Sequence, residues 1–136
     1  MADLTITRQD VALSTAAVSF IRVQVAEAVT QGQPLYRAAT NSKYYKAAAT
    51  GSSAANASVL AMTAASADGY VLAVKSGDVI IGATTTQGTT YVVSATAGSI
   101  APHADLGSGN YVTNLGIAIS ATVLRLNIQA SGIAIP

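Results

Sequence analysis

The feature that most constrains the fold of this chain is the alternation of apolar and polar residues along short segments. It is clearest near the C-terminus, where Leu124, Leu126 and Ile128 are separated by single polar residues, and it recurs over residues 21–25. Side chains of a β-strand alternate between two faces, whereas an amphipathic helix requires an apolar period of 3.6. No long stretch has the helical period. The sequence therefore predicts an all-β fold.

Turn-forming residues divide the chain into many short strands. Residues 35–37 and 43–46 are extended segments on either side of Asn41 and Ser42, which predicts a hairpin. Residues 47–58 are rich in Ala and Ser and contain no large apolar residue, so we expect a loop or a short helix there. Such spacing indicates a small compact β-barrel or sandwich of short antiparallel strands. The length of 136 residues fits a single domain over residues 1–136.

The small share of charged residues argues against several classes of binding partner. Charged residues make up 10% of the chain, against about 25% in an ordinary domain, and seven Lys and Arg are offset by six Asp and Glu. We expect no nucleic-acid partner, because such proteins concentrate basic residues on one surface. We expect no membrane partner either, since no apolar run approaches ~20 residues and the N-terminus lacks a signal-peptide pattern. So little surface charge indicates a protein covered largely by other chains.

Residues suited to catalysis or metal binding are scarce. The chain has no Cys and a single histidine, His103, two residues before Asp105. Asp105 could orient His103 so that the imidazole acts as a general base, but the simpler interpretation is that His103 is a polar residue of a loop. No His cluster is present to hold zinc or copper, no Ser lies in a G-x-S-x-G motif, and no Gly-rich segment has the pattern of a nucleotide-binding loop. We therefore predict a protein that is not an enzyme and binds neither cofactor nor metal.

Six segments along the chain together resemble a known family in their residues and order. They are 2–7 (ADLTIT), 32–36 (GQPLY), 80–84 (IIGAT), 89–94 (TTYVVS), 116–118 (GIA) and 124–129 (LRLNIQ). Over nearly its full length the chain resembles the small capsid decoration proteins of tailed bacteriophages. These are also called cement or head-stabilising proteins.

The resemblance implies a β-rich structural protein of the virion without enzymatic activity. It implies a location on the outer surface of the capsid, with assembly in the host cytoplasm. Its partners would be the major capsid protein and further copies of the chain. A homotrimer at three-fold and quasi-three-fold positions would bridge neighbouring capsid subunits.

Six apolar or aromatic residues are candidates for protein–protein contact: Leu4, Ile6, Tyr44, Tyr45, Ile133 and Ile135. The first two belong to residues 1–8, which form either an arm reaching the capsid or a neighbouring subunit, or an edge strand of the chain's own sheet. The two tyrosines stand between lysines and form either a partner contact or a cross-strand pair covered by lysine stems. The two isoleucines near the C-terminus are apolar, so we expect a partner to cover the surface that they form.

Three alternatives stay open. The chain could be another virion component, namely a head fibre base, a tail protein or a baseplate protein. It could be a carbohydrate-binding β module that uses Tyr44, Tyr45 or Tyr111 as a sugar platform. A hydrolase is the most distant hypothesis, because it would require His103 and an acidic partner to be brought together.

Overall fold

The computed structural model describes residues 3–4, 6, 11–13 and 20–136 of the chain. Within these residues it contains eleven strands and one 3-10 helix, so the predicted all-β fold is confirmed. The elements are β1 (Ala12–Leu13), β2 (Ile21–Gln24), β3 (Pro34–Arg37), β4 (Tyr44–Lys46), β5 (Ala57–Ala61), β6 (Tyr70–Val74), β7 (Ser76–Ile80), β8 (Thr90–Val93), β9 (Ile100–Pro102), η2 (His103–Asp105), β10 (Tyr111–Ala118) and β11 (Val123–Ala134).

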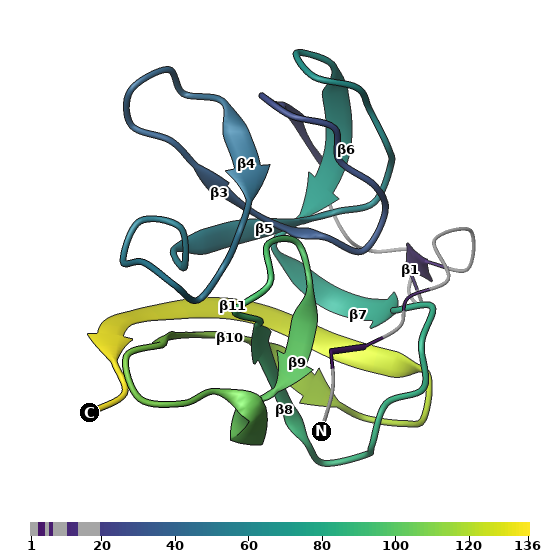
Figure 1. The fold of residues 1–136 in the computed structure, drawn as a ribbon. Helices are drawn as coiled ribbons and strands as arrows, with labels where there is room; N and C mark the ends of the chain where they lie inside the picture. The colour runs from purple at the N-terminus through teal and green to yellow at the C-terminus, as the bar shows by residue number, and fades with distance from the viewer. Residues whose placement is uncertain (1–2, 5, 7–10, 14–19) are drawn as a thin grey trace.

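The strands form two antiparallel sheets that pack in a sandwich-like arrangement rather than a closed barrel (Figure 1). The six-stranded sheet has the order β1-β7-β11-β10-β8-β9, and the five-stranded sheet has the order β2-β6-β5-β3-β4. Strand β5 lies against β11 at the boundary between the sheets. The chain passes from one sheet to the other at Lys75, between β6 and β7.

The five-stranded sheet curls so that its two edges approach each other. Val25, directly after β2, forms a parallel bridge with Tyr44 at the start of β4, and the Ala26 amide donates a hydrogen bond of 2.9 Å to the Tyr44 carbonyl. The predicted hairpin is present as β3 and β4, with Tyr36 opposite Tyr45. The curled sheet encloses a group of buried side chains that we call the second core: Val23, Val25, Val29, Leu35, Val59, Ala61, Val71 and Ala73.

A larger first core fills the space between the two sheets. Its members come from both sheets and from the loop after β4: Ala47, Ala57, Leu60, Val74, Val79, Ile81, Tyr91, Val93, Ile100, Leu115, Ala118, Leu124 and Leu126. Leu124 and Leu126 are buried while Arg125 and Asn127 between and beside them are exposed, as the alternation predicts. The six-stranded sheet therefore has one apolar inner face and one outer face that is open to solvent.

Of the segment 47–58, residues 47–56 form a loop rather than a short helix, and Ala57 and Ser58 belong to β5. One turn is closed by the Ala55 amide, which donates to the Gly51 carbonyl at 2.9 Å, but the chain then enters β5 at Ala57. The Ala49 amide instead donates at 2.8 Å to the carbonyl of Ser94, which directly follows β8 of the other sheet. An isolated helix of this length is marginal in water, so these sheet contacts decide the conformation.

Strands β10 and β11 approach each other closely at Gly116. A Cβ atom built on this residue would overlap the carbonyl oxygen of Arg125 on the neighbouring strand. The pairing of β10 with both of its neighbours shifts register between Asn114 and Gly116. Glycine is therefore required here by space, because no side chain fits between the two backbones.

We predict that Gly116→Ala lowers the free energy of unfolding by about 2–3 kcal/mol, because the overlap with the Arg125 backbone forces the two strands apart. Urea unfolding followed by circular dichroism measures the change. Gly107→Ala is the matched control, since a Cβ there meets no atom within 4 Å. Equal stabilities of the two variants would contradict the steric role of Gly116.

Candidate interaction surface

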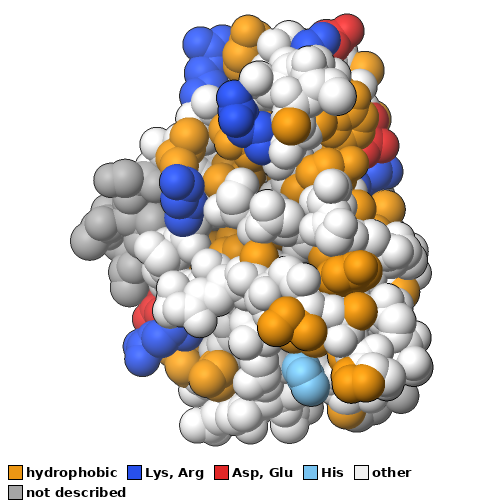
Figure 2. All heavy atoms as spheres, turned by 90° about the vertical axis from the view of Figure 1, so that its left-hand side faces the viewer, with side chains coloured by type: hydrophobic (Ala, Val, Ile, Leu, Met, Phe, Trp, Pro, Cys, Tyr) orange, Lys and Arg blue, Asp and Glu red, His pale blue; other side chains and the backbone are white. Residues whose placement is uncertain are grey.

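The charged residues are divided unequally between the two parts of the fold. Residues 76–136, which include β7 to β11, contain only three of them, namely Asp78, Asp105 and Arg125. All other Asp, Glu, Lys and Arg residues lie before residue 76. On the face shown in Figure 2, charged side chains lie mainly in the upper part of the view, and few are visible in the lower part. Counting charges along the sequence by segment would have revealed this division.

A shallow hollow of about 270 Å³ lies on the outer face of the six-stranded sheet. We call it the Ile117 hollow. Its lining comes from β8, β10 and β11: Thr90, Asn114, Gly116, Ile117, Arg125, Asn127 and Gln129. The strand register brings these residues together, because Ile117 is opposite Arg125 and Asn114 is opposite Gln129. This hollow could not be predicted from the sequence, because no local motif links three separate strands.

The charge of Arg125 at one side of the hollow is neutralised by Asp78 on β7. The guanidinium donates from Nε to Oδ1 at 3.0 Å and from Nη2 to Oδ2 at 3.3 Å, which is a two-point contact. The Asp78 side chain is 19% exposed. The hydrogen bond from Arg125 holds the pKa of Asp78 below its ordinary value, and the same bond raises the pKa of Arg125. The hollow therefore carries almost no net charge at neutral pH.

A second, wider hollow of about 610 Å³ adjoins the first and shares Thr90 and Asn114 with it. His103 lies on its rim as an exposed residue at the start of η2. In the part of the chain that the structure describes, no group of three or more His, Cys, Asp or Glu residues could hold a metal ion. The structure does not test the expectation that the chain lacks enzymatic activity, which stays a prediction.

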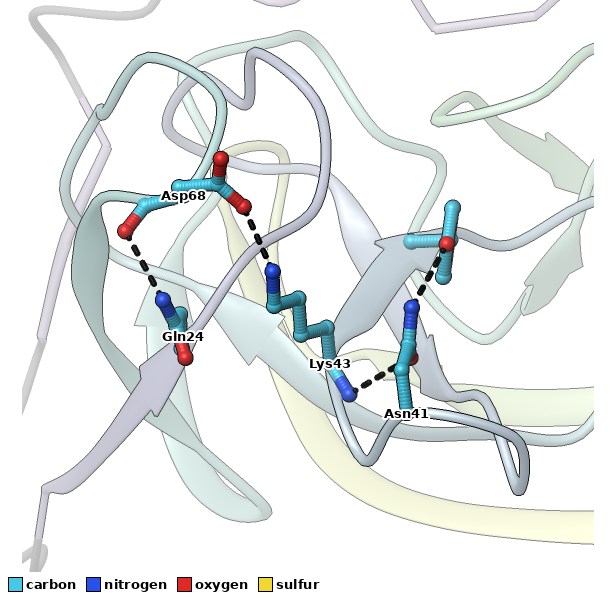
Figure 3. Close-up of polar contacts among 5 residues, drawn as sticks. Gln24, Asn41, Lys43 and Asp68 are labelled. Carbon is cyan, nitrogen blue, oxygen red and sulfur yellow. Dashed lines mark hydrogen bonds and ion pairs between the residues drawn. The ribbon is translucent and has the colours of Figure 1, made fainter.

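Tyr44 and Tyr45 make contacts within the five-stranded sheet. Tyr44 packs against the second core, while the Tyr45 ring stacks on Tyr36 with centroids 5.7 Å apart. Beside them, Lys43 donates from Nζ to Oδ1 of Asp68 at 2.7 Å (Figure 3). This hydrogen bond raises the pKa of Lys43. These contacts are those of a cross-strand pair, and a partner contact through the tyrosines stays a prediction.

Leu4 and Ile6 are partly buried and pack against the first core. The Leu4 amide donates to the Ile100 carbonyl of β9 at 2.8 Å, and the Asp3 carboxylate accepts a hydrogen bond of 2.6 Å from the Ser94 hydroxyl. These three residues of the expected 1–8 arm are thus held by their own chain. The rest of that arm lies outside the described residues.

The two C-terminal isoleucines differ in exposure. Ile133 is 69% exposed at the end of β11, whereas Ile135 is half-buried. The Ile135 backbone is held at both of its groups: its amide donates to the Asn110 carbonyl at 2.8 Å, and its carbonyl accepts from the Gly109 amide at 2.7 Å. Tyr111, the third proposed sugar platform, is partly buried at the start of β10. Ile133 is thus accessible to a partner, and its contact with one stays a prediction.

A further exposed patch, missed in the sequence analysis, lies on the outer face of β2 and β6. Tyr70 and Leu72 are 52% and 41% exposed, and Phe20 before β2 is also exposed. The Arg22 guanidinium lies 4.3 Å from the centre of the Tyr70 ring. The period-two pattern of the sequence predicts that Arg22 faces outward. Which residues lie beside Arg22 is determined by the pairing of β2 with β6 and could not be predicted from that pattern.

No known family model and no curated protein matches this chain. Within the described residues, none of the helical structure is long and apolar enough to cross a membrane.

We predict that Asp78→Asn makes the protein less stable at pH 7 and that the loss shrinks in acid. The folded-state pKa of Asp78 is lowered by Arg125, so the stabilisation is complete above the unfolded-state pKa of about 4 and disappears as the pH falls through the lower folded-state value. Urea unfolding of wild type and variant between pH 2 and 7 measures the difference in their free energies of unfolding at each pH. In an Arg125→Gln background the same substitution should have no such pH-dependent effect.

Proposed function

We propose that this chain is a non-enzymatic structural protein of a tailed-phage virion that binds the outer surface of the capsid. In this role it stabilises the head by bridging neighbouring major capsid subunits as a homotrimer at three-fold and quasi-three-fold positions. The proposal rests on the resemblance of six chain segments to capsid decoration proteins and on the outer face of the six-stranded sheet, where the charges of Arg125 and Asp78 are paired with each other.

The pairing of Arg125 with Asp78 on this outer face is the main structural support for the proposal. Transfer of a charged group from water into an interface costs free energy unless the group is well paired. The outer face formed by β10 and β11 presents amides and Ile117 around Arg125, whose charge is already paired with Asp78. Such a face can be covered by another protein without removing unpaired charges from water. A charged coat, which keeps free monomers apart, is absent from this part of the described chain.

The antiparallel framework also suits a docking protein. Every named strand pair is antiparallel, and both cores are filled by buried side chains. A surface built on such a framework loses little conformational freedom when it binds. In a trimer, several weak contacts act together, so that attachment is stronger than any one contact provides.

Density-gradient sedimentation of native source material, probed with an antibody against the chain, tests the location. We expect the chain to travel with DNA-filled particles in hundreds of copies for each particle. A few copies per particle would favour a fibre base, tail or baseplate component. Recovery only in the soluble fraction would contradict a virion role and would make a glycan-binding screen the next experiment.

The oligomeric state is a separate prediction. Light scattering coupled to size-exclusion chromatography should give three times the chain mass of 13.6 kDa for the purified protein. Trimer formation would bring three docking surfaces to one lattice position. A mass of one chain at all concentrations would contradict the trimer, and binding to particles would then have to be explained by single copies.

A further inference from the structure

We infer that the Ile117 hollow is a docking site for an extended, uncharged polypeptide segment. Resting on the proposed function, this segment belongs to the capsid subunit that the protein covers. The outer face of the six-stranded sheet would then be the side of the protein that meets the shell.

The polar side chains of the hollow have the chemistry of peptide recognition. Among the described residues, none hydrogen-bonds to the side-chain amides of Asn114, Asn127 or Gln129, and all three residues are exposed. A carboxamide offers both a donor and an acceptor, as does a peptide group of an approaching backbone. Amides from two adjacent strands can thus satisfy successive peptide groups of one bound segment.

The shape of the surface favours an extended segment. The Ile117 hollow continues into the second hollow through their shared residues Thr90 and Asn114, so that the depression runs across β8, β10 and β11. Ile117, 49% exposed, provides an apolar contact within it. An extended peptide presents side chains alternately, so one of its apolar side chains can rest on Ile117 while its backbone meets the amides.

The electrostatics favour an uncharged occupant. Arg125 is the only basic residue of the lining, and its guanidinium is engaged by Asp78 at 3.0 Å. An acidic segment would have to compete with Asp78 for this guanidinium, and a basic one would meet no free carboxylate in the lining of the hollow. Neutral segments rich in small polar and apolar residues avoid both costs.

A glycan fits this surface less well than a polypeptide. Sugar-binding surfaces commonly place an aromatic ring against the apolar face of the sugar. Neither hollow is lined by a Phe, Tyr or Trp side chain, and Tyr44, Tyr45 and Tyr111 all lie outside both linings. The polypeptide is therefore the occupant that the lining favours.

Hydroxyl-radical footprinting tests the site directly on the full-length protein. The protein is oxidised free and after binding to particles that have been freed of this chain. We expect oxidation of Ile117 to fall on binding while oxidation of Leu72, which is 41% exposed on the other sheet, stays the same. Protection of Leu72 with Ile117 unchanged would overturn the inference and leave the proposed function intact.

A matched pair of variants gives a second measurement. Ile117→Lys should weaken particle binding by roughly tenfold or more, because an ammonium group would lose water at the interface. Leu72→Lys places the same charge on a strand residue of similar exposure and should bind as wild type does. Circular dichroism and urea unfolding of both variants confirm that they are folded. Equal binding by the two variants would overturn the site.

Failure of the proposed function can be separated from failure of this inference. If wild-type protein binds no particle, the capsid role fails, and the free protein is then titrated with a panel of uncharged 12-residue peptides and, in parallel, with soluble glycans. Shifts of the side-chain amide NMR signals of Asn114, Asn127 and Gln129 with peptides alone would support a peptide site. Shifts with glycans alone, no shift at all, or protection of Ile117 by self-association of the free protein would each overturn it.

Discussion

The structure depends on strand β5 (Ala57–Ala61), whose side chains enter two different cores. Leu60 is fully buried in the first core between the sheets, while its neighbour Val59 is fully buried in the second core inside the curled sheet. Because neighbouring side chains of a strand point to opposite faces, a one-residue change in register would exchange the two environments. The strand thus couples the five-stranded sheet to the six-stranded one. The six-stranded sheet is needed to cover the face that carries Leu60, whereas the face that carries Val59 is covered within the curled sheet itself.

This coupling explains why the two parts of the chain can have such different surfaces. The first core takes the inner face of the six-stranded sheet, and the outer face is left to present amides, Ile117 and the paired Arg125. Most charged residues lie with the five-stranded sheet, where Lys43 pairs with Asp68. A protein with one charged end and one nearly uncharged face is suited to lie on another protein through the uncharged face while the charged end meets solvent. This asymmetry supports both the proposed capsid role and the proposed docking hollow.

Parts of the fold could be predicted because their signals are local. The alternation of Leu124 and Leu126 with exposed neighbours predicted one strand, and Asn41 and Ser42 marked a real hairpin. The candidate site could not be predicted in the same way. The hollow around Ile117 exists only because β8, β10 and β11 are adjacent, and the shifted register near Gly116 determines which side chains share it. Likewise, the alternation could not decide whether Leu4 serves a partner or its own core, and it packs on its own core.

The sequence by itself determined the all-β class, the inward and outward faces of the strands with clear alternation, and the shortage of charge, because these depend on side-chain period and composition alone. The tertiary structure decided which strands share a sheet, that Ser76–Ile80 extends the six-stranded sheet although Ser76, Gly77 and Asp78 resemble a turn, and that residues 47–56 form a loop. The physical reason is the same in each case. Backbone hydrogen bonds between strands join residues far apart in the chain, and no local pattern specifies the partner.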